Sequence, residues 1–471
     1  MPEASTPRRS KPASRRDFLK TSTVLAGGAL AGGLSLARSA HAAGSDVLKL
    51  GLIGCGGRGT GAAGEAMTAD KNTRLVAMGD AFEDRVTGSL ENVKRAGKER
   101  GYFGQIDVSA DRCFSGFDAY QKVLDSGVDV VILAETPHFR PQHLKAAVAA
   151  GKHVFCEKPV AVDAPGIRSV LESTEEAKKK GLSLVSGLCW RYETAVSATM
   201  QQILDGTIGE LVSIQVTYNT GTIGGRQRSK DRPETEMQYQ MRNWYCFTWL
   251  SGDHNVEQHV HSLDKVAWAM RDEPPLAAWG LGGRQVRVDP IYGDIYDHHA
   301  VVYEYANGVL AHAYCRQQPG CWGDVTDKFF GTNGRASVLG LRSDEFRIRD
   351  RRGEVTWKFA GERNAMYVAE HEALFKSIRS GKPINNGLYM ARSTMLAILG
   401  RMVDYTGQRI TWEEAINSRQ TLAPKSYAWL VPLAIVLVGV AIGALWHWRS
   451  GRSTRPRRRT GAGPAGPTPA S

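Results

Sequence analysis

A glycine-rich stretch near the start of the chain has the residue types and spacing of a phosphate-binding loop. Its pattern is Gly54-x-Gly56-x-x-Gly59, it follows an apolar segment, and Asp80 comes 21 residues after the last glycine. The first glycine permits a tight turn, the second lets backbone amides approach a pyrophosphate, and the third lets a helix pack closely on a strand. The N-terminus of that helix stabilises the phosphate charge. The loop therefore predicts a dinucleotide-binding site.

Two charged side chains bear on which dinucleotide binds there. The Asp80 carboxylate can accept hydrogen bonds from ribose hydroxyls and would repel a 2′-phosphate, which favours NAD over NADP. Arg58, inside the loop, could bind a phosphate and offset that repulsion, so NADP stays possible. We predict NAD as the cofactor, bound by Gly54, Gly56, Arg58, Gly59 and Asp80.

A second chemistry-bearing segment is HNVEQHVH at residues 254–261. Glu257 and His261 are four residues apart, so on a helix the carboxylate would orient the imidazole and raise its basicity. The segment also has zinc-ligand residue types, but His259 and His261 would share a face only on a strand. Because no single geometry serves these residues together, we predict no metal site.

Alternating strands and helices must position the glycine loop. Apolar strands are predicted at 47–53, 73–78, 128–134 and 152–156, and helical segments at about 118–126 and 144–150. This alternation favours a parallel, doubly wound sheet in a domain spanning 46–160.

The pattern changes after residue 182. Strands are predicted at 211–218, 300–305 and 309–314, with turn signals such as Ala306-Asn307-Gly308 between them. These features indicate a largely antiparallel sheet in a second α/β domain spanning 161–425, with a last helix pair after residue 383.

Several motifs together resemble the Gfo/Idh/MocA oxidoreductase family over about residues 48–424. They are the glycine loop, Glu157-Lys158-Pro159, and Glu257-x-x-x-His261 followed by Leu263-Asp264. The resemblance implies an N-terminal Rossmann domain and a second domain whose open sheet walls the substrate site. It also implies that Lys158 lies beside the nicotinamide and the substrate, and that His261 is the general acid/base.

The same resemblance places Thr136, Pro137 and Glu157 among the cofactor-binding residues. The chain departs from the usual family pattern at His138, where Asn is common, and at Glu257, where inositol dehydrogenase-like members usually have Asp.

These assignments fit the oxidation of a secondary alcohol. That reaction needs a base for the hydroxyl proton while hydride leaves to C4 of nicotinamide. We predict His261 as the base, Glu257 as its acidic partner, and Lys158 as the cation that stabilises the forming alkoxide. Each residue alone also has an ordinary structural explanation, but the matched set favours catalysis.

The two ends of the chain resemble targeting segments. In residues 1–43, Arg15-Arg16 precedes Phe18-Leu19-Lys20, an apolar Gly/Ala-rich run and Ala40-His41-Ala42, as in a twin-arginine signal peptide. Residues 428–446 contain no ionisable side chain and are long enough to cross a bilayer, which predicts a transmembrane helix at 427–448. By the positive-inside rule the basic tail 449–471 stays in the cytoplasm. We expect the enzyme to be exported and anchored in the inner membrane.

The net charge of +12 is concentrated in these ends. Residues 1–44 carry +5 and residues 449–471 carry +6, which leaves +1 for the body and argues against a nucleic-acid partner. The composition, 42% hydrophobic and 23% charged, is that of a globular protein of about two domains. The seven cysteines are scattered and form no Cys-x-x-Cys pair, so neither a zinc knuckle nor a redox dithiol is indicated. Cys315 and Cys321 could pair, but buried free thiols are favoured.

Together these features predict a membrane-anchored, exported NAD(P)-dependent oxidoreductase acting on a sugar, polyol or related hydroxy compound, and forming a homo-oligomer. Since free nicotinamide nucleotide should be scarce outside the cytoplasm, we expect a tightly retained cofactor that is recycled on the enzyme. One alternative is a glycosidase that uses bound NAD transiently, although its acetylgalactosaminidase members commonly lack the lysine that Lys158 matches. The other is a cofactor-binding protein without turnover.

Overall fold

The computed structural model describes residues 47–228, 234–339 and 346–427. The predicted signal peptide at 1–43, all but the first residue of the predicted transmembrane helix at 427–448, and the basic tail lie outside these ranges. Within the described ranges, no helix has the length and apolar character needed to cross a membrane.

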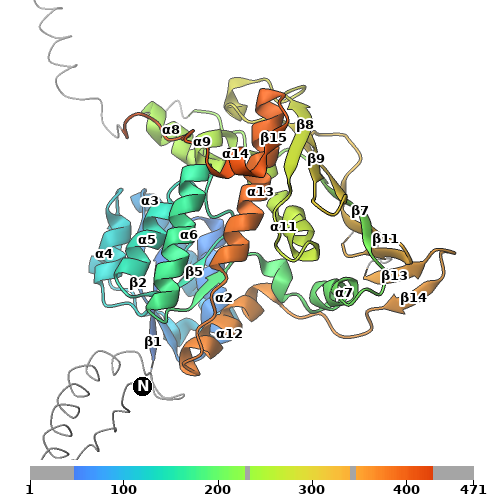
Figure 1. Ribbon diagram of the computed structural model, residues 1–471. Helices are drawn as coiled ribbons and strands as arrows, with labels where there is room; N and C mark the ends of the chain where they lie inside the picture. Colours follow the sequence, from blue (N-terminus) through green and yellow to red (C-terminus); the bar gives the residue numbers. More distant parts are fainter. Residues whose placement is uncertain (1–46, 229–233, 340–345, 428–471) are drawn as a thin grey trace, which may run out of the picture. The chain divides into compact units, whose positions relative to one another are not determined.

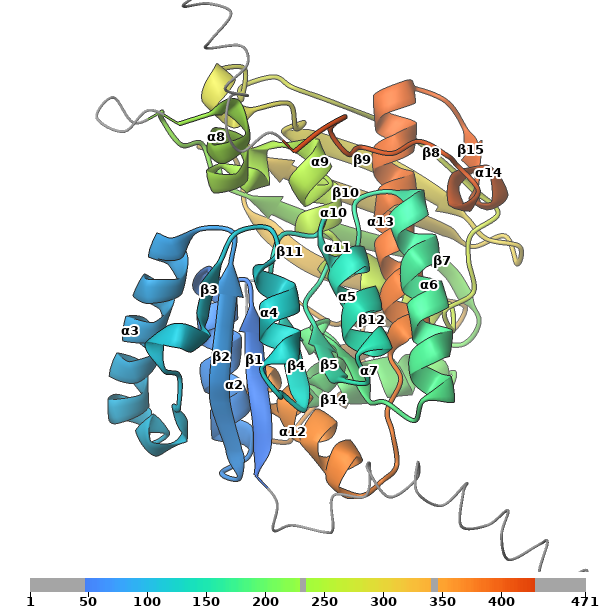
Figure 2. The ribbon, with the colours of Figure 1, turned by 90° about the vertical axis from the view of Figure 1, so that its left-hand side faces the viewer.

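The N-terminal domain is built on a six-stranded parallel sheet with the order β3-β2-β1-β4-β5-β6 (Figures 1 and 2). Its strands are β1 (Leu48–Ile53), β2 (Thr73–Asp80), β3 (Cys113–Ser115), β4 (Val130–Leu133), β5 (His153–Cys156) and β6 (Leu184–Ser186). The predicted parallel sheet is thus confirmed. The predicted domain boundary at residue 160 falls between β5 and β6, so the last strand of this sheet lies beyond it.

Helices cover both faces of the parallel sheet, because its strands are apolar on both sides. Leu50 and Leu52 pack in one core with helices on the first face, whereas Val131 and Leu133 pack in the core of the second face. The first face carries α2 (Gly57–Ala69), α3 (Glu83–Arg100) and α12 (Met366–Arg379); the second carries α4 (Ala119–Asp125), α5 (Arg140–Ala149) and α6 (Ala164–Lys179). Helix α12 comes from the far end of the chain and packs against α2 (Figure 1).

The second domain is built on a nine-stranded sheet with the order β14-β13-β12-β11-β7-β10-β9-β8-β15. Its strands are β7 (Leu211–Thr220), β8 (Ala277–Gly283), β9 (His298–Glu304), β10 (Leu310–Gln317), β11 (Asp324–Gly331), β12 (Gly334–Ser337), β13 (Arg347–Asp350), β14 (Val355–Lys358) and β15 (Ile410–Thr411). All neighbours are antiparallel except β7 and β10, which run parallel. The prediction of a largely antiparallel second sheet is confirmed.

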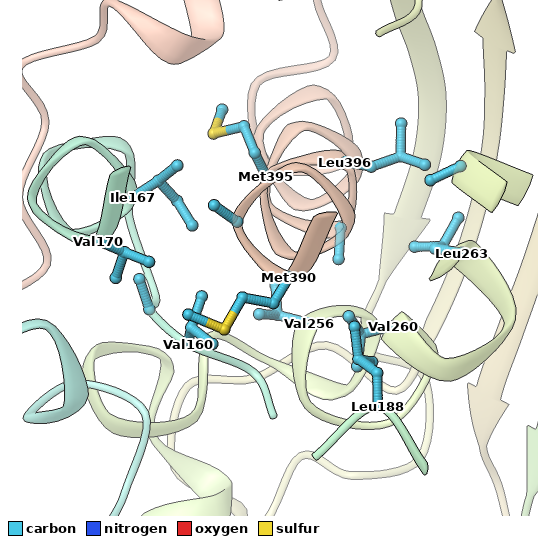
Figure 3. Close-up of a cluster of buried hydrophobic side chains, with 14 of the residues drawn as sticks. Val160, Ile167, Val170, Leu188, Val256, Val260, Leu263, Met390, Met395 and Leu396 are labelled. Atoms are coloured by element: carbon cyan, nitrogen blue, oxygen red, sulfur yellow. The ribbon is translucent and has the colours of Figure 1, made fainter. Parts of the chain in front are cut away.

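Helix α13 (Gly387–Thr406) connects the two sheets through a shared apolar core. It packs against α6 on one side and against α11 (Val260–Ala269) and β8 on the other. Met390 and Met395 are completely buried and Leu396 nearly so, because this helix is apolar almost all round. Figure 3 shows these side chains meeting Ile167 and Val170 of α6 and Leu263 of α11. The core therefore fixes α11, which carries His261, against the rest of the molecule.

The remaining elements are short. They are helices α7 (Thr194–Leu204), α9 (Thr248–Ser251), α10 (His254–Glu257) and α14 (Trp412–Ile416), and 3-10 turns at Phe103–Gln105, Ala110–Arg112, Cys189–Tyr192, Trp244–Cys246 and Pro290–Tyr292. Helix α8 (Glu236–Arg242) belongs to a separate unit, in which Arg228 pairs with Glu236 and lies over the Tyr239 ring.

All seven cysteines are free. Five are buried, as expected, but Cys321 is exposed and Cys113 is partly exposed. Cys315 and Cys321 do not form a disulfide.

Candidate active site

The glycine loop joins β1 to α2, and two of its glycines are required by close packing. A Cβ at Gly54, whose φ is +92°, would lie 2.2 Å from the backbone nitrogen of Glu135, and one at Gly59 would lie 1.9 Å from the Gly54 carbonyl oxygen. A Cβ at Gly56 would instead meet no atom within 4 Å. Gly56 caps α2 without a side-chain hydrogen bond, so the first amides of the helix are left for another acceptor. This open, uncapped helix start fits the pyrophosphate of a dinucleotide.

We expect Gly56→Val to weaken nucleotide binding without harming the fold. The new side chain would enter open space in the free protein but would occupy the position that the pyrophosphate must approach. Binding of NADH, measured by fluorescence titration, should weaken by about tenfold or more, which corresponds to about 1.4 kcal/mol. Gly88→Val, on α3 and also facing open space, is the matched control and should leave binding unchanged. Normal NADH affinity in Gly56→Val would contradict the assignment of the loop.

Asp80 ends β2 beside this loop, as predicted. Its Oδ2 accepts a hydrogen bond from the Cys55 amide (2.7 Å) and its Oδ1 accepts one from the Phe82 amide (3.0 Å). These bonds fix the carboxylate, while burial raises its pKa. Contact with a ribose hydroxyl remains a prediction.

Arg58, which the sequence predicts to bind the cofactor, is paired with two glutamates in the structure. Its Nε donates to Glu157 Oε1 (2.5 Å), an Nη donates to Glu65 Oε2 (2.6 Å), and the guanidinium lies over the Tyr367 ring at 4.6 Å. Although burial disfavours the charge, Glu157 and Glu65 raise the pKa of Arg58 above its ordinary value. The guanidinium is thus held by carboxylates.

Glu157, also predicted to bind the cofactor, is the other half of this contact. It is buried, and its Oε2 accepts a hydrogen bond from the amide of Lys158 (3.1 Å). Through Arg58 and Glu157, the start of α2 is therefore linked to the residue that the sequence singles out for catalysis.

Thr136 and Pro137 lie in the loop that follows β4. Thr136 is half-buried and its carbonyl accepts from the Phe139 amide, whereas Pro137 is buried. The preceding Glu135 approaches Gly54 closely and bonds through Oε1 to His143 Nδ1 (3.0 Å). The loop after β4 thus lies against the glycine loop, where a cofactor-binding segment is expected.

Lys158 and Glu257 meet although 99 residues separate them. Lys158 Nζ donates to Glu257 Oε1 at 3.0 Å and to the Glu257 carbonyl oxygen at 2.6 Å. Both side chains are largely buried, with exposed fractions of 12% and 9%. Gln258 Nε2 donates to the other carboxylate oxygen of Glu257 (2.6 Å), and its own carbonyl accepts from the Tyr218 hydroxyl (3.1 Å). The segment after β5 is thereby tied to α10.

The predicted pairing of Glu257 with His261 is not what the structure shows. Helix α10 ends at Glu257 and α11 begins at Val260, so the two residues do not lie on one continuous helix. Both Glu257 oxygens are bonded to Lys158 and Gln258, while His261 Nδ1 is buried without a hydrogen-bond partner. The acidic residue therefore holds the lysine, and no carboxylate among the described residues bonds to His261 Nδ1.

The surroundings of His261 keep its ring neutral. Burial, followed by the charges of Lys158 and Lys265, lowers its pKa well below the ordinary value. A neutral imidazole is ready to accept a proton at physiological pH.

Lys265, which no motif singles out, lies one helical turn after His261 and donates to its carbonyl oxygen. In the sequence, its role is indicated only by its position four residues after His261. Its partner Asp327 is on β11 and could not be found without the fold.

The other histidines of the segment are structural. His259 Nδ1 bonds to Asn255 Oδ1 (3.0 Å), and His254 Nδ1 bonds to the Tyr245 hydroxyl (3.0 Å). Burial lowers the pKa of both rings. In the part of the chain that the structure describes, no three His, Cys, Asp or Glu side chains are grouped to hold a metal ion.

Several known proteins are similar to this chain. It is 23% identical over 343 residues to "Myo-inositol 2-dehydrogenase" of Thermotoga maritima, covering 71% of this chain and 90% of that protein. It is 25% identical over 267 residues to "Inositol 2-dehydrogenase" of Rhizobium meliloti, covering 56% of this chain and 67% of that protein. Among solved structures, an aldose-aldose oxidoreductase from Caulobacter crescentus superposes with a TM-score of 0.59 at 17% identity, over 78% of this chain and 99% of the other.

Residues 48–185 match the Gfo/Idh/MocA family model, described as an oxidoreductase family with an NAD-binding Rossmann fold. That range contains the glycine loop, Asp80 and Lys158, and ends within β6. We conclude that the chain is an oxidoreductase, and that its residues 48–185 are similar to the NAD-binding Rossmann fold of the Gfo/Idh/MocA family.

Proposed function

We propose that the protein transfers hydride between a nicotinamide cofactor and a secondary alcohol of an inositol, a sugar or a related polyol. The observation that carries this proposal is the contact of Lys158 with Glu257 beside a neutral His261, on the segment that Glu157 and Arg58 link to the glycine loop. The names of the inositol 2-dehydrogenase relatives support the substrate class.

The side chains present fit NAD, which when bound supplies the hydride acceptor. His261 accepts the proton of the reacting hydroxyl, because its ring is uncharged in the buried site. Lys158 places a positive charge where the alkoxide forms, and Glu257 fixes that ammonium group by two hydrogen bonds. Arg58 and Glu157 hold the Lys158 backbone relative to the start of α2. In the reverse direction, the protonated His261 returns the proton.

A substrate panel tests this function. The full-length protein would be incubated with NAD and with inositols, aldoses and other polyols, while the absorbance of reduced nicotinamide is followed. Formation of NADH with at least one polyol or sugar supports the proposal. Release of nitrophenol from nitrophenyl glycosides without net NADH would replace it with a redox glycosidase. Cofactor binding without turnover of any compound would replace it with a non-catalytic binding function.

We expect NAD to be preferred over NADP, and Asp80→Ser to narrow the preference. The fixed carboxylate repels a 2′-phosphate, and Arg58 is engaged by Glu157 and Glu65. The ratio of the NADPH and NADH dissociation constants should be about ten or more in the native protein and fall several-fold in the variant. Asp84→Ser, a nearby exposed carboxylate on α3, is the control and should leave the ratio unchanged. Equal affinities in the native protein would refute the preference.

We further propose that the protein is exported by the twin-arginine route, anchored by residues 427–448, homo-oligomeric, and loaded with a cofactor that it retains. The sequence of the two ends and the scarcity of free nucleotide outside the cytoplasm support these points. Cell fractionation, together with nucleotide analysis of the denatured purified protein, tests them. A cytoplasmic location, or the absence of released nicotinamide nucleotide, would overturn the corresponding point.

A further inference from the structure

Lys265 is a buried cation placed one helical turn after His261. Its side chain is completely buried, and Nζ donates to the His261 carbonyl oxygen (2.7 Å) and pairs with Oδ2 of Asp327 on β11 (2.9 Å). Asp327 is also completely buried, and the ammonium group lies 5.6 Å from the centre of the Trp190 ring. The ion pair thus ties the first turn of α11 to the second sheet.

A contribution to protein stability is by itself a poor explanation for this ion pair. Removing two charges from water is costly, and replacing a buried pair with apolar side chains of similar volume is often neutral or stabilising. The surroundings would accept such a replacement, because Leu263, Val266 and Phe329 beside the pair's positions are completely buried and apolar. Because stability does not require the charged pair, we expect its role to lie in the neighbouring site at His261.

The pair is oriented with its positive end toward His261. It is Lys265 Nζ that contacts the His261 backbone, whereas Asp327 contacts Lys265. Two further cations act on the same ring, Lys158 from the segment after β5 and Arg58 from α2, and each of them is paired with a glutamate.

In the described part of the chain, the charged groups on the other elements packed against α11 have partners of their own; Asp324 of β11, for example, accepts from the Thr217 and Thr326 hydroxyls. Helix α7 carries no titratable side chain, the Tyr218 hydroxyl of β7 donates to Gln258, and Asp264 of α11 is paired with Arg191. The titratable side chains of α13 are engaged elsewhere: Asp404 with His299, Tyr405 with Asp253, Arg401 and Arg392 with backbone carbonyls, and Tyr389 under Arg191.

We propose that Lys265, paired with Asp327, is a positioning residue of the reaction: it fixes the first turn of α11, and its buried charge keeps the His261 imidazole in the neutral, proton-accepting form. The use of His261 as a base rests on the proposed function. The protonation state of His261 can be measured whether or not the proposed function holds.

Histidine NMR of the purified full-length chain tests the proposal. The His261 signal would be assigned by its loss in His261→Gln and followed with pH in the native protein and in Lys265→Met/Asp327→Leu, which removes the pair without leaving an unpaired charge. The native signal should remain that of a neutral ring through mildly acidic pH, and the double variant should titrate about one pH unit higher. The acid limb of kcat/KM should move in parallel, with NADH affinity unchanged.

A matched control removes an ion pair that joins two other elements. Arg379 of α12 pairs with Asp70 at the end of α2 (2.6 Å), so Arg379→Met/Asp70→Asn should alter stability but leave the His261 titration in place. Lys265→Met alone provides a second variant, and it too should raise the His261 pKa. An unchanged His261 titration in both Lys265 variants would overturn the proposal. A shifted titration with no turnover of any alcohol by the native protein would instead remove the proposed function and leave the electrostatic effect established.

Discussion

Replacing Lys158 with methionine is expected to lower kcat by about a hundred- to a thousandfold, which is typical for the loss of one group that stabilises charge in the transition state. The substitution keeps an unbranched side chain of similar length but removes the ammonium group. NADH binding should change little, because the glycine loop and Asp80 are untouched. The effect should therefore appear in kcat, measured with the best substrate of the panel, and much less in the cofactor affinity.

The variant also leaves the Glu257 carboxylate without its cation, so a structural effect must be separated from a catalytic one. Lys158→Met/Glu257→Gln removes the unpaired charge and should remain as slow as the single variant if the ammonium group acts on the substrate. Lys158→Arg should recover only part of the activity, because a planar guanidinium does not reproduce the geometry of the ammonium group. Lys122→Met, which breaks an exposed pair with Asp118, is the control and should be fully active. A kcat in Lys158→Met close to that of the native protein would show that the lysine is structural.

Much of the parallel domain could be predicted because its signals are local. The apolar strands, the glycine spacing and the position of Asp80 each depend on a few consecutive residues, and the sheet places them as expected. The packing of α12 on α2 could not be predicted, since it brings together segments about 300 residues apart. A separation of 97 residues likewise hides the parallel pairing of β7 with β10 in the second sheet.

The site shows where a spacing argument fails. Four residues between Glu257 and His261 imply one helical turn, yet the chain breaks between α10 and α11, and Glu257 turns to Lys158. For Arg58 the place in the loop predicts a phosphate contact, which stays a prediction, but it gives no sign of the ion pairs with Glu157 and Glu65. In both cases the deciding partner is a buried opposite charge, and a buried charge must be paired. Which partner it finds depends on the tertiary fold.

Protein stability should decrease as the pH rises from about 6.5 to about 9, because a buried histidine keeps its proton over a range in which the unfolded chain has already lost it. His299 is completely buried between two carboxylates, with Nδ1 on Asp404 (2.8 Å) and Nε2 on Asp253 (3.3 Å). Although burial opposes its charge, Asp253 and Asp404 raise the pKa of His299 to about 9. A folded-state pKa above the unfolded value of about 6.5 stabilises the fold fully below pH 6.5 and is lost as the pH rises through 9. The loss in unfolding free energy is on the order of 3 kcal/mol.

The other buried histidines with a shifted pKa act on the acid side and do not contribute to the alkaline loss. Burial lowers the pKa of five rings, so their contribution is present above the unfolded value and is lost as the pH falls below it; they are His138, His254, His259, His261 and His371. Denaturant unfolding at a series of pH values should therefore show greatest stability near neutral pH.

His299→Gln isolates the alkaline effect. It leaves two buried carboxylates without a cation, so at pH 6.5 it should cost about 3 to 5 kcal/mol, and the slope between pH 7.5 and 9 should flatten. His298→Gln is the matched control, since the neighbouring ring is 36% exposed, and it should keep the slope. An unaltered slope in His299→Gln would assign the alkaline loss to other groups.

The protonation of His299 also bears on catalysis. Its partner Asp253 caps helix α10, and the last residue of α10 is Glu257, the partner of Lys158. Activity should therefore decline above pH 9 even where the protein remains folded, and His299→Gln should already show that loss at neutral pH.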